Sequence, residues 1–323
     1  MDAAYYSWVF RSNGFADEFY AWGHGIVDDL WTTRWSDMKN ILVMVPPLPE
    51  QQAIADYLDC ECGKIDELRA KIEAQIADLA TYKKSVITEA VTGKCKIENG
   101  EWKMRPRTEL RDSGVEWIGE VPEGWKVGKL SYSFDVQLGK MLDAAKIVGN
   151  YLVPYLRNQD VQWGLIKTDG LPQMDIYPAE RDKYKVVKGD LLVCEGGDVG
   201  RCAIWNSNED MYFQKAIMRL RPRNKNFDCA RWMYYQIFCA KHNGAFDNVT
   251  GKATIAHLPA EKLAVSKFAF PPLPEQREIA DYLDKKCGSI DAAVAKCRAQ
   301  LEDLATYKKS LIFECVTGKR TVA

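Results

Sequence analysis

The sequence contains no long apolar segment, and its first residues do not have the pattern of a signal peptide. Its longest obvious apolar run covers 41–45 and stops at two prolines, far short of the roughly 20 residues that a membrane-spanning helix needs. The first five residues have neither the basic start nor the apolar stretch of a signal peptide. These absences exclude a membrane protein and make us expect a cytoplasmic one.

Signatures of metal and nucleotide chemistry are equally scarce. The ten cysteines include no Cys-x-x-Cys pair, and the three histidines stand far apart. Such a scatter is typical of free thiols in a reducing compartment. No Gly-x-x-x-x-Gly-Lys-Ser/Thr phosphate loop occurs, which argues against an ATPase. We therefore expect no catalytic residues, no metal and no cofactor.

Charge is nearly balanced overall but unevenly distributed. The whole chain carries a formal charge of −1, whereas residues 100–270 hold 25 lysines and arginines against 21 aspartates and glutamates. A mildly basic middle between acidic flanks permits nucleic-acid binding there.

A repeat frames that middle. Residues 46–94 recur at 271–319 without gaps, and 34 of the 49 positions are identical. Both copies open with Pro-Pro-Leu-Pro-Glu-Gln and close with Val-Thr-Gly-Lys. The same structural unit therefore occurs twice, 225 residues apart, with a different unit between the two copies.

Each copy predicts a short helix followed by a long one. In the first copy we expect a helix over 50–59, a break at Gly63 and a long helix over 65–92; the second copy predicts a long helix over 290–317. Apolar residues at steps of three and four favour antiparallel packing of the two long helices along a narrow seam. The predicted packing residues are Leu68, Ile72, Leu79, Tyr82, Leu301, Leu304 and Tyr307. Gln75 and Gln300 either interrupt this seam as buried polar residues or lie on its rim.

The middle unit differs in composition from the repeat, because it is rich in glycine, aromatic and β-branched residues. It predicts a mixed, mostly antiparallel α+β fold, with helices at about 228–243 and 259–264. The candidate strands are Trp125–Val136, Val153–Leu156, Lys185–Val187, Asp190–Glu195, Ala203–Trp205 and Ala216–Arg221. Residues 1–45 resemble the last part of such a unit, with Tyr5, Tyr6 and Val9 on a helix.

Three features together carry a family resemblance. They are the duplicated segment, the stretch from Gly114 to Trp125, and Gly189-Asp190-Leu191-Leu192-Val193 followed by Val199-Gly200-Arg201. The chain resembles the specificity subunit of a type I restriction–modification enzyme, apparently without most of a first target recognition domain. The duplicated segment is the most specific of the three features.

The resemblance implies an organisation and a function. We expect a remnant of a first recognition domain at 1–45, a helical spacer at 46–99, a complete target recognition domain at 100–270 and a second spacer at 271–323. The family's subunits read double-stranded DNA without catalysing a reaction. Methyltransferase subunits dock on their helical regions, and translocase–nuclease subunits join for restriction.

A different interpretation stays open. A chain with one complete reader is expected either to define a DNA methylation site or to act as a truncated interaction fragment. Such a fragment would bind methyltransferase subunits or complement another half-subunit without defining a site itself. A second specificity chain is a further expected partner, and pairing with it would define a gapped palindromic site. Glu195, Asp198 and Lys215 could also mimic a metal-dependent nuclease site, but the resemblance favours a structured loop.

Candidate DNA contacts lie in loops that offer base-reading or phosphate-binding groups. The candidates are Arg157, Asn158, Gln159, Gly197, Arg201, Gln214, Lys215, Lys252 and Thr254. Alternation along 217–223 also places Arg219, Arg221 and Arg223 on one strand face. That face is expected either to contact phosphates or to be solvated.

Overall fold

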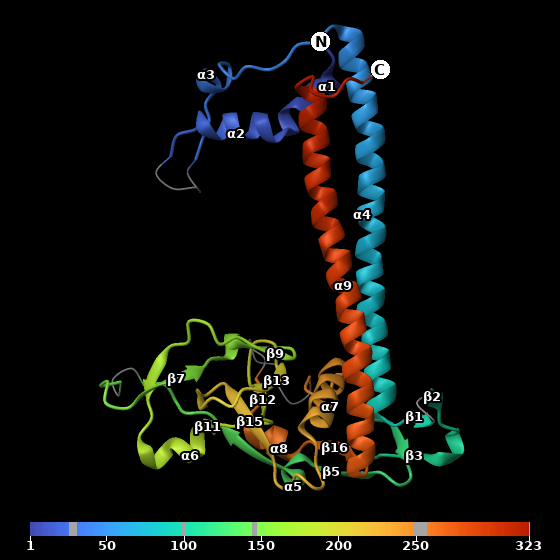
Figure 1. Ribbon diagram of the computed structural model, residues 1–323, viewed down its shortest axis with the longest axis vertical. Coiled ribbons are helices and arrows are strands. Elements are labelled where there is room, and N and C mark those ends of the chain that lie inside the picture. Colours follow the sequence, from blue (N-terminus) through green and yellow to red (C-terminus); the bar gives the residue numbers. More distant parts are fainter. Residues whose placement is uncertain (26–30, 99–100, 144–146, 248–256, 323) are drawn as a thin grey trace. The chain divides into compact units, whose positions relative to one another are not determined.

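The computed structural model describes residues 1–323 except 26–30, 99–100, 144–146, 248–256 and 323 (Figure 1). The chain forms two compact units. Unit 1 comprises residues 1–80 and 289–323, and unit 2 comprises residues 81–288. No helix among the described residues is long and apolar enough to cross a membrane.

Two long helices contribute to both units. They are α4 (Leu48–Val91) and α9 (Leu273–Val316), each of 44 residues. The predicted break at Gly63 is wrong, because α4 runs through it, as α9 runs through Gly288. A single glycine inside a helix costs only about 0.5–1 kcal/mol relative to alanine. The burial of Cys62 and Ile65 on either side of Gly63 outweighs that cost.

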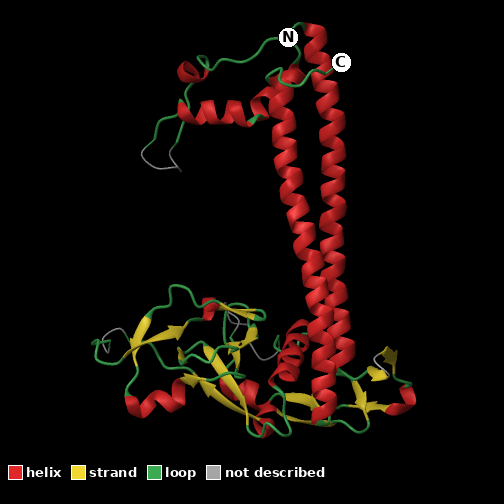
Figure 2. Cartoon of the chain, in the orientation of Figure 1, coloured by secondary structure: helices red, strands yellow, loops and turns green. Residues whose placement is uncertain are grey.

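The helices pack antiparallel, as the sequence predicts: the colours of Figure 1 show their opposite chain directions, and Figure 2 shows the two helices side by side. In unit 1, the start of α4 packs on the end of α9, and in unit 2 the end of α4 packs on the start of α9. Asp66 and Lys308 form an ion pair of 2.6 Å along the unit 1 contact. The buried residues of the unit 1 contact include Ile54, Leu58, Ile65, Leu311 and Cys315. Those of the unit 2 contact include Val86, Ile87, Ile279, Leu283 and Cys287.

The predicted seam residues differ in burial. Ile72 is buried, while Leu79, Leu301 and Leu304 are half-buried. Leu68, Tyr82 and Tyr307 stay 46%, 47% and 48% exposed, because a two-helix contact covers only a narrow stripe. Gln75 and Gln300 are exposed, so they lie on the rim.

Two four-stranded sheets form the centre of unit 2. In the first, the strand order is β13-β12-β15-β6, and all of its pairings are antiparallel. In the second, the order is β10-β7-β14-β11, and only β14 and β7 run parallel. The first sheet consists of β6 (Phe134–Leu138), β12 (Leu191–Cys194), β13 (Cys202–Ile204) and β15 (Ile217–Pro222). The second consists of β7 (Leu152–Leu156), β10 (Gln173–Asp175), β11 (Lys185–Val186) and β14 (Met211–Phe213). The mixed, mostly antiparallel α+β prediction is confirmed.

Helices and short hairpins complete unit 2. Its main core lies between the first sheet and the helices α7 (Ala230–His242) and α8 (Ala260–Val265). The smaller helices are α5 (Leu130–Ser133) and α6 (Arg181–Tyr184). The paired short strands are β1 (Cys95–Glu98) with β2 (Glu101–Met104), β3 (Leu110–Asp112) with β4 (Glu120–Pro122), β5 (Lys126–Lys129) with β16 (Lys267–Phe270), and β8 (Val161–Gln162) with β9 (Leu165–Ile166).

One strand prediction needs correction, and two strands of the central sheets, β10 and β14, were not predicted. The stretch predicted as one strand over 125–136 is β5, then α5, then β6. The turn of α5 buries Leu130 in the core beneath the sheet. Strand β14 was not predicted, and its three buried residues carry too short a pattern to identify it.

Unit 1 contains α1 (Ala3–Arg11), α2 (Asn13–Ala21) and α3 (Trp35–Met38). Helix α1 docks on the first repeat copy as α7 docks on the second. Tyr5 Oη donates to the carbonyl of Met44 (3.2 Å), and Trp232 Nε1 donates to that of Ala269 (3.0 Å). Met44 and Ala269 are exactly one repeat offset of 225 apart.

Two further contacts repeat in the same way. Trp8 Nε1 donates to Asp59 Oδ1 (2.8 Å), and Tyr235 Oη donates to Asp284 Oδ1 (2.7 Å). Asp59 and Asp284 are again 225 positions apart. Helices α1 and α7 are therefore structural counterparts on the two copies.

Candidate nucleic-acid interface

Most of the candidate DNA-contacting residues meet around Asn158 in unit 2. Asn158 begins a 3₁₀ turn (Asn158–Asp160) that follows β7. Its side-chain Nδ2 donates to the carbonyls of Gly196 (3.1 Å) and Ala216 (3.2 Å). Arg201 Nη2 donates to both the backbone oxygen and Oδ1 of Asn158, each at 2.8 Å. The side-chain amide of Asn158 thus connects its own loop to the loops that contain Gly196 and Ala216, which are distant in the sequence.

The backbone around this point is tightly constrained. A side chain at Gly139 would place Cβ 2.2 Å from the carbonyl oxygen of Gln214, so only glycine fits. Lys215 N donates to the carbonyl of Lys140 (2.7 Å), which holds the two segments together. Ala216 has φ of +94°, the only positive φ of a non-glycine residue in the described part of the chain. Such strain persists only where surrounding contacts hold it, and it gathers at functional sites.

Some of the candidate residues are exposed, whereas others form hydrogen bonds within the protein. Gln159, Gly197 and Lys215 are exposed, and Gln214 is half-buried. Asn158 and Arg201 are half-buried and bonded to each other through Nη2 of the arginine. Lys252 and Thr254 lie outside the described residues.

Arg157 is held by a neighbouring carboxylate. Its Nε and Nη2 donate to Asp160 at 2.9 and 2.8 Å, and its backbone N–H donates to the same carboxylate at 2.7 Å. Burial works to raise the pKa of Asp160, but the hydrogen bonds from Arg157 outweigh it and hold that pKa below its usual range. Asp160 therefore stays ionised and fixes the turn that presents Gln159.

The acidic residues that could mimic a nuclease site face different partners. Glu195 is buried and lies 3.1 Å from His257 Nε2. Asp198 accepts from Trp163 Nε1 (2.8 Å) and pairs with Lys241 (3.6 Å). Within the described ranges, no group of three histidine, cysteine, aspartate or glutamate residues is placed to hold a metal ion. This arrangement fits a structured loop.

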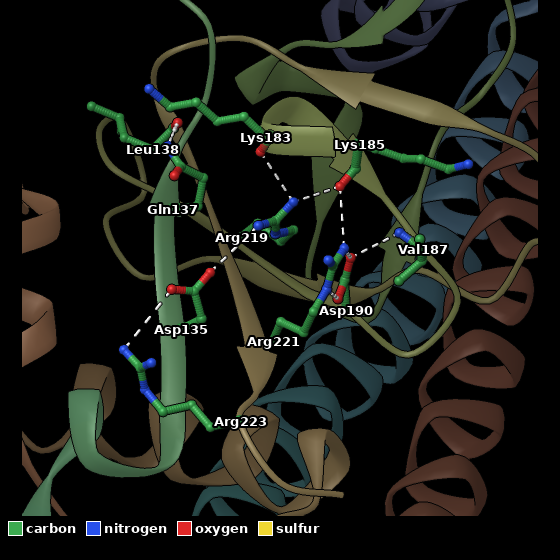
Figure 3. Close-up of polar contacts among 10 residues, drawn as sticks. All are labelled: Asp135, Gln137, Leu138, Lys183, Lys185, Val187, Asp190, Arg219, Arg221 and Arg223. Atoms are coloured by element: carbon green, nitrogen blue, oxygen red, sulfur yellow. Dashed lines mark hydrogen bonds and ion pairs between the residues drawn. The ribbon is translucent and has the colours of Figure 1, made fainter. Parts of the chain in front are cut away.

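Two arginines of β15 are already bound within the fold: Arg219 is buried, and Arg221 is half-buried in an ion pair (Figure 3). Arg219 is only 4% exposed and donates to the carbonyls of Lys183 (3.2 Å) and Lys185 (2.6 Å). Arg221 binds both carboxylate oxygens of Asp190 at 2.7 Å. Both expectations for Arg219 and Arg221 are therefore wrong. The second sheet and Asp190 cover that face, which the alternation along one strand does not reveal.

Arg223 differs from the other two arginines. It is exposed, it donates to the carbonyl of Ser131 at 2.9 Å, and it lies 3.9 Å from Asp135.

A pocket lined by tyrosine side chains lies beside these loops and was not predicted from the sequence. Lys140 pairs with Glu180 and lies over the rings of Tyr177 and Tyr184, with Nζ 5.7 and 5.8 Å from their centroids. These residues line a pocket of about 310 Å³. No local pattern joins positions 140, 177 and 184, so no sequence signal could have identified the pocket.

Comparison with known proteins gives one family and several relatives. Residues 122–302 match the model of the type I restriction modification DNA specificity domain. The chain is 23% identical over 292 residues to the EcoBI specificity subunit of Escherichia coli, covering 88% of this chain and 59% of that one. It is 25% identical over 291 residues to the MjaVIII specificity subunit of Methanocaldococcus jannaschii, covering 87% and 62%. The chain thus spans less than two thirds of these relatives' length.

Solved structures share the fold. One, from a study of complex assembly and conformational transition of the type I R-M system, has a TM-score of 0.73 at 17% identity, covering 97% of this chain and 70% of that one. The HsdS subunit of Thermoanaerobacter tengcongensis has a TM-score of 0.55 at 17% identity, covering 99% and 71%.

Proposed function

The chain belongs to the family of type I restriction modification DNA specificity proteins, and from this premise we propose that it selects the DNA site at which partner methyltransferase subunits act. The observation that carries the proposal is the family match over 122–302, which includes the loops tied by Asn158 and Arg201. The chain itself would perform no catalysis.

The proposed reading surface consists of the exposed members of the candidate set. Gln159 presents an exposed amide whose NH2 group can donate to a base edge, while its oxygen accepts from Arg157 Nη2 at 3.1 Å. Lys215 presents an ammonium for a phosphate or guanine. The backbone at Gly197, free of a side chain, can approach DNA closely. Asn158 and Arg201 are assigned a positioning role, because their polar groups bind each other. Lys252 and Thr254 remain predicted contacts.

We assign the paired helices to the binding of methyltransferase subunits. Leu68, Tyr82 and Tyr307 leave apolar side chains about half-exposed along α4 and α9, which suits protein contacts. The boundaries proposed for the four segments stay at 1–45, 46–99, 100–270 and 271–323. The equivalence of α1 and α7 supports 1–45 as the counterpart of the end of the recognition domain. Translocase–nuclease subunits would join this assembly for restriction.

The test is co-expression of the chain with its methyltransferase partner, followed by methylation-sensitive sequencing of cellular DNA. Gln159→Ala and Lys215→Ala are expected to abolish or relax methylation at the recognised site while the complex still assembles. Lys262→Ala, an exposed lysine on α8, serves as the matched control. Normal methylation by both test variants would disprove the placement of the reading surface.

The alternative function is an interaction fragment that complements another specificity polypeptide. Because the chain spans less than two thirds of these relatives' length, the definition of a whole DNA site by this chain stays a proposal. The methylation pattern separates the cases. A gapped palindrome indicates a symmetric pair of this chain. An asymmetric bipartite site indicates a second, different reader, and absence of methylation indicates a fragment that defines no site.

A further inference from the structure

Exposed apolar side chains gather at one place in unit 2. Met141 and Leu142 are 65% and 46% exposed, and Ile147, Val148 and Tyr177 are exposed as well. We call these five residues the apolar patch. All of them except Val148 line the pocket of about 310 Å³. Contiguous apolar side chains that a fold leaves in solvent indicate a binding surface.

Hydrogen bonds and ring contacts hold the apolar patch in place. Asp175 is 3% exposed and accepts from the backbone N–H of Val148 at 2.6 Å. Lys140 pairs with Glu180 and lies over the ring of Tyr177, with Nζ 5.7 Å from the ring centroid. The backbone at Val148 and the ring of Tyr177 are therefore positioned before any partner binds, which lowers the entropy cost of binding.

The apolar patch adjoins the proposed reading surface. Lys140 N donates to the carbonyl of Phe213 at 3.0 Å, and Lys215 N donates to the carbonyl of Lys140 at 2.7 Å. A parallel β-bridge also joins Lys140 to Gln214. Met141 directly follows Lys140 in the chain. A DNA duplex bound at Lys215 would therefore lie within reach of the Met141 side chain.

The chemistry of the apolar patch favours contact with a base over contact with a phosphate. Among the residues that line the pocket, Lys140 is the only cation, and its ammonium is already paired with Glu180. Phosphate contacts come mainly from lysine, arginine, polar side chains and backbone N–H groups. In the major groove of DNA, thymine presents its C5-methyl group, and apolar side chains contact that group.

We propose that Met141 and Leu142 select a thymine in the recognised DNA site through contact with its C5-methyl group. The inference rests on the proposed function and deepens it, because it names the base that one part of the reading surface selects. Burial of the methyl group against these side chains favours thymine over uracil, which lacks only that group. Lys215 supplies a polar contact to the same stretch of DNA.

The experiment uses the full-length chain assembled with its methyltransferase partner, and the DNA site that methylation sequencing identifies. Each thymine of the site is replaced in turn by deoxyuridine, which removes only the methyl group. Fluorescence anisotropy measures the affinity of the complex for each duplex. At least one replacement is expected to weaken binding by about fourfold, the effect of one buried methyl group.

Variants assign this thymine preference to the apolar patch. Met141→Ala and Leu142→Ala should each reduce the ratio of the two affinities, and the double variant should bind thymine and uracil duplexes equally. Met104→Ala removes a methionine of β2 that is 66% exposed, and it should leave the ratio unchanged. Because the ratio compares two duplexes on one protein preparation, a partial loss of folded protein does not alter it.

Equal affinity of the unaltered complex for every thymine and uracil duplex would overturn the inference. A preference that survives in the double variant would also overturn it, since another residue would then contact the methyl group. If the folded double variant no longer assembles with the methyltransferase, the apolar patch is a protein contact instead. A complex that methylates no DNA site would refute the proposed function and this inference with it, whereas the other three results leave the proposed function intact.

Discussion

Arg201 and Asn158 are joined by two hydrogen bonds of 2.8 Å from one guanidinium nitrogen. The same asparagine holds the carbonyls of Gly196 and Ala216. The pair thus fixes the relative positions of the loops that carry Gln159, Gly197 and Lys215.

We therefore expect Arg201→Ala to behave differently from Lys215→Ala. Loss of hydrogen bonds from a charged group should lower the free energy of unfolding by about 1.5–3 kcal/mol, and site methylation should fall with it. Lys215→Ala should change stability by less than about 0.5 kcal/mol, because the side chain is exposed. Urea unfolding and methylation sequencing of both variants check this. Equal stability of the two variants would show that Arg201 does not position the loops.

The Arg221–Asp190 pair gives a second prediction. Asp190 is 1% exposed, and Arg221 binds both of its carboxylate oxygens. Arg221→Ala leaves this buried charge without its cation, which should cost about 3–5 kcal/mol of unfolding free energy. Arg223→Ala, one residue beyond the end of β15 and exposed, should cost less than about 1 kcal/mol. Thermal unfolding measures both, and similar losses would contradict the assignment.

The hydrogen bonds of Asp175 lead us to expect a specific pH dependence of the folding stability. Backbone N–H groups of Tyr151, Gly149 and Val148 donate to its carboxylate and hold its pKa below the ordinary value. A depressed pKa stabilises the fold above the unfolded value of about 3.9, and this stabilisation is lost as pH falls through the folded pKa.

The check for Asp175 is a series of urea midpoints from neutral pH to about pH 2. Asp175→Asn should be less stable than the parent at neutral pH, and the difference should shrink as pH falls below about 4. Asp182→Asn, at an exposed position of α6, should show no such trend. A constant difference for Asp175→Asn would mean that the ionised carboxylate is not the stabilising form.

The helix contact gives a further prediction. Ile72 is 8% exposed and Leu68 is 46% exposed on the same helix. Ile72→Asp places a charge in an apolar contact and should cost about 3 kcal/mol or more, whereas Leu68→Asp should cost clearly less. Circular dichroism melts distinguish the two. Equal destabilisation would indicate that the seam is wider than the structure shows.

Several elements could be predicted because their signals are local or repeated. The 225-residue repeat predicts paired helices, since two matched apolar stripes find their partner in each other. Helix α7 and strands such as β12 were predicted from apolar residues and flanking turn signals, and the structure buries those residues. The break at Gly63 was predicted wrongly, because the local cost of a glycine says nothing of the partner helix that offsets it.

The sequence alone determined the repeat, the antiparallel helices, the mixed fold of the middle unit and the set of loops from which DNA contacts are proposed. Only the tertiary structure decided which side chains in those loops are free. Arg201 and Arg219 have the same chemistry as an exposed DNA-reading arginine, but Asn158 and the carbonyls of Lys183 and Lys185 occupy them. The hydrogen-bond partners of a long cationic side chain come from segments that are dozens of residues away in the sequence. A local sequence pattern therefore does not reveal which partners the side chain will have.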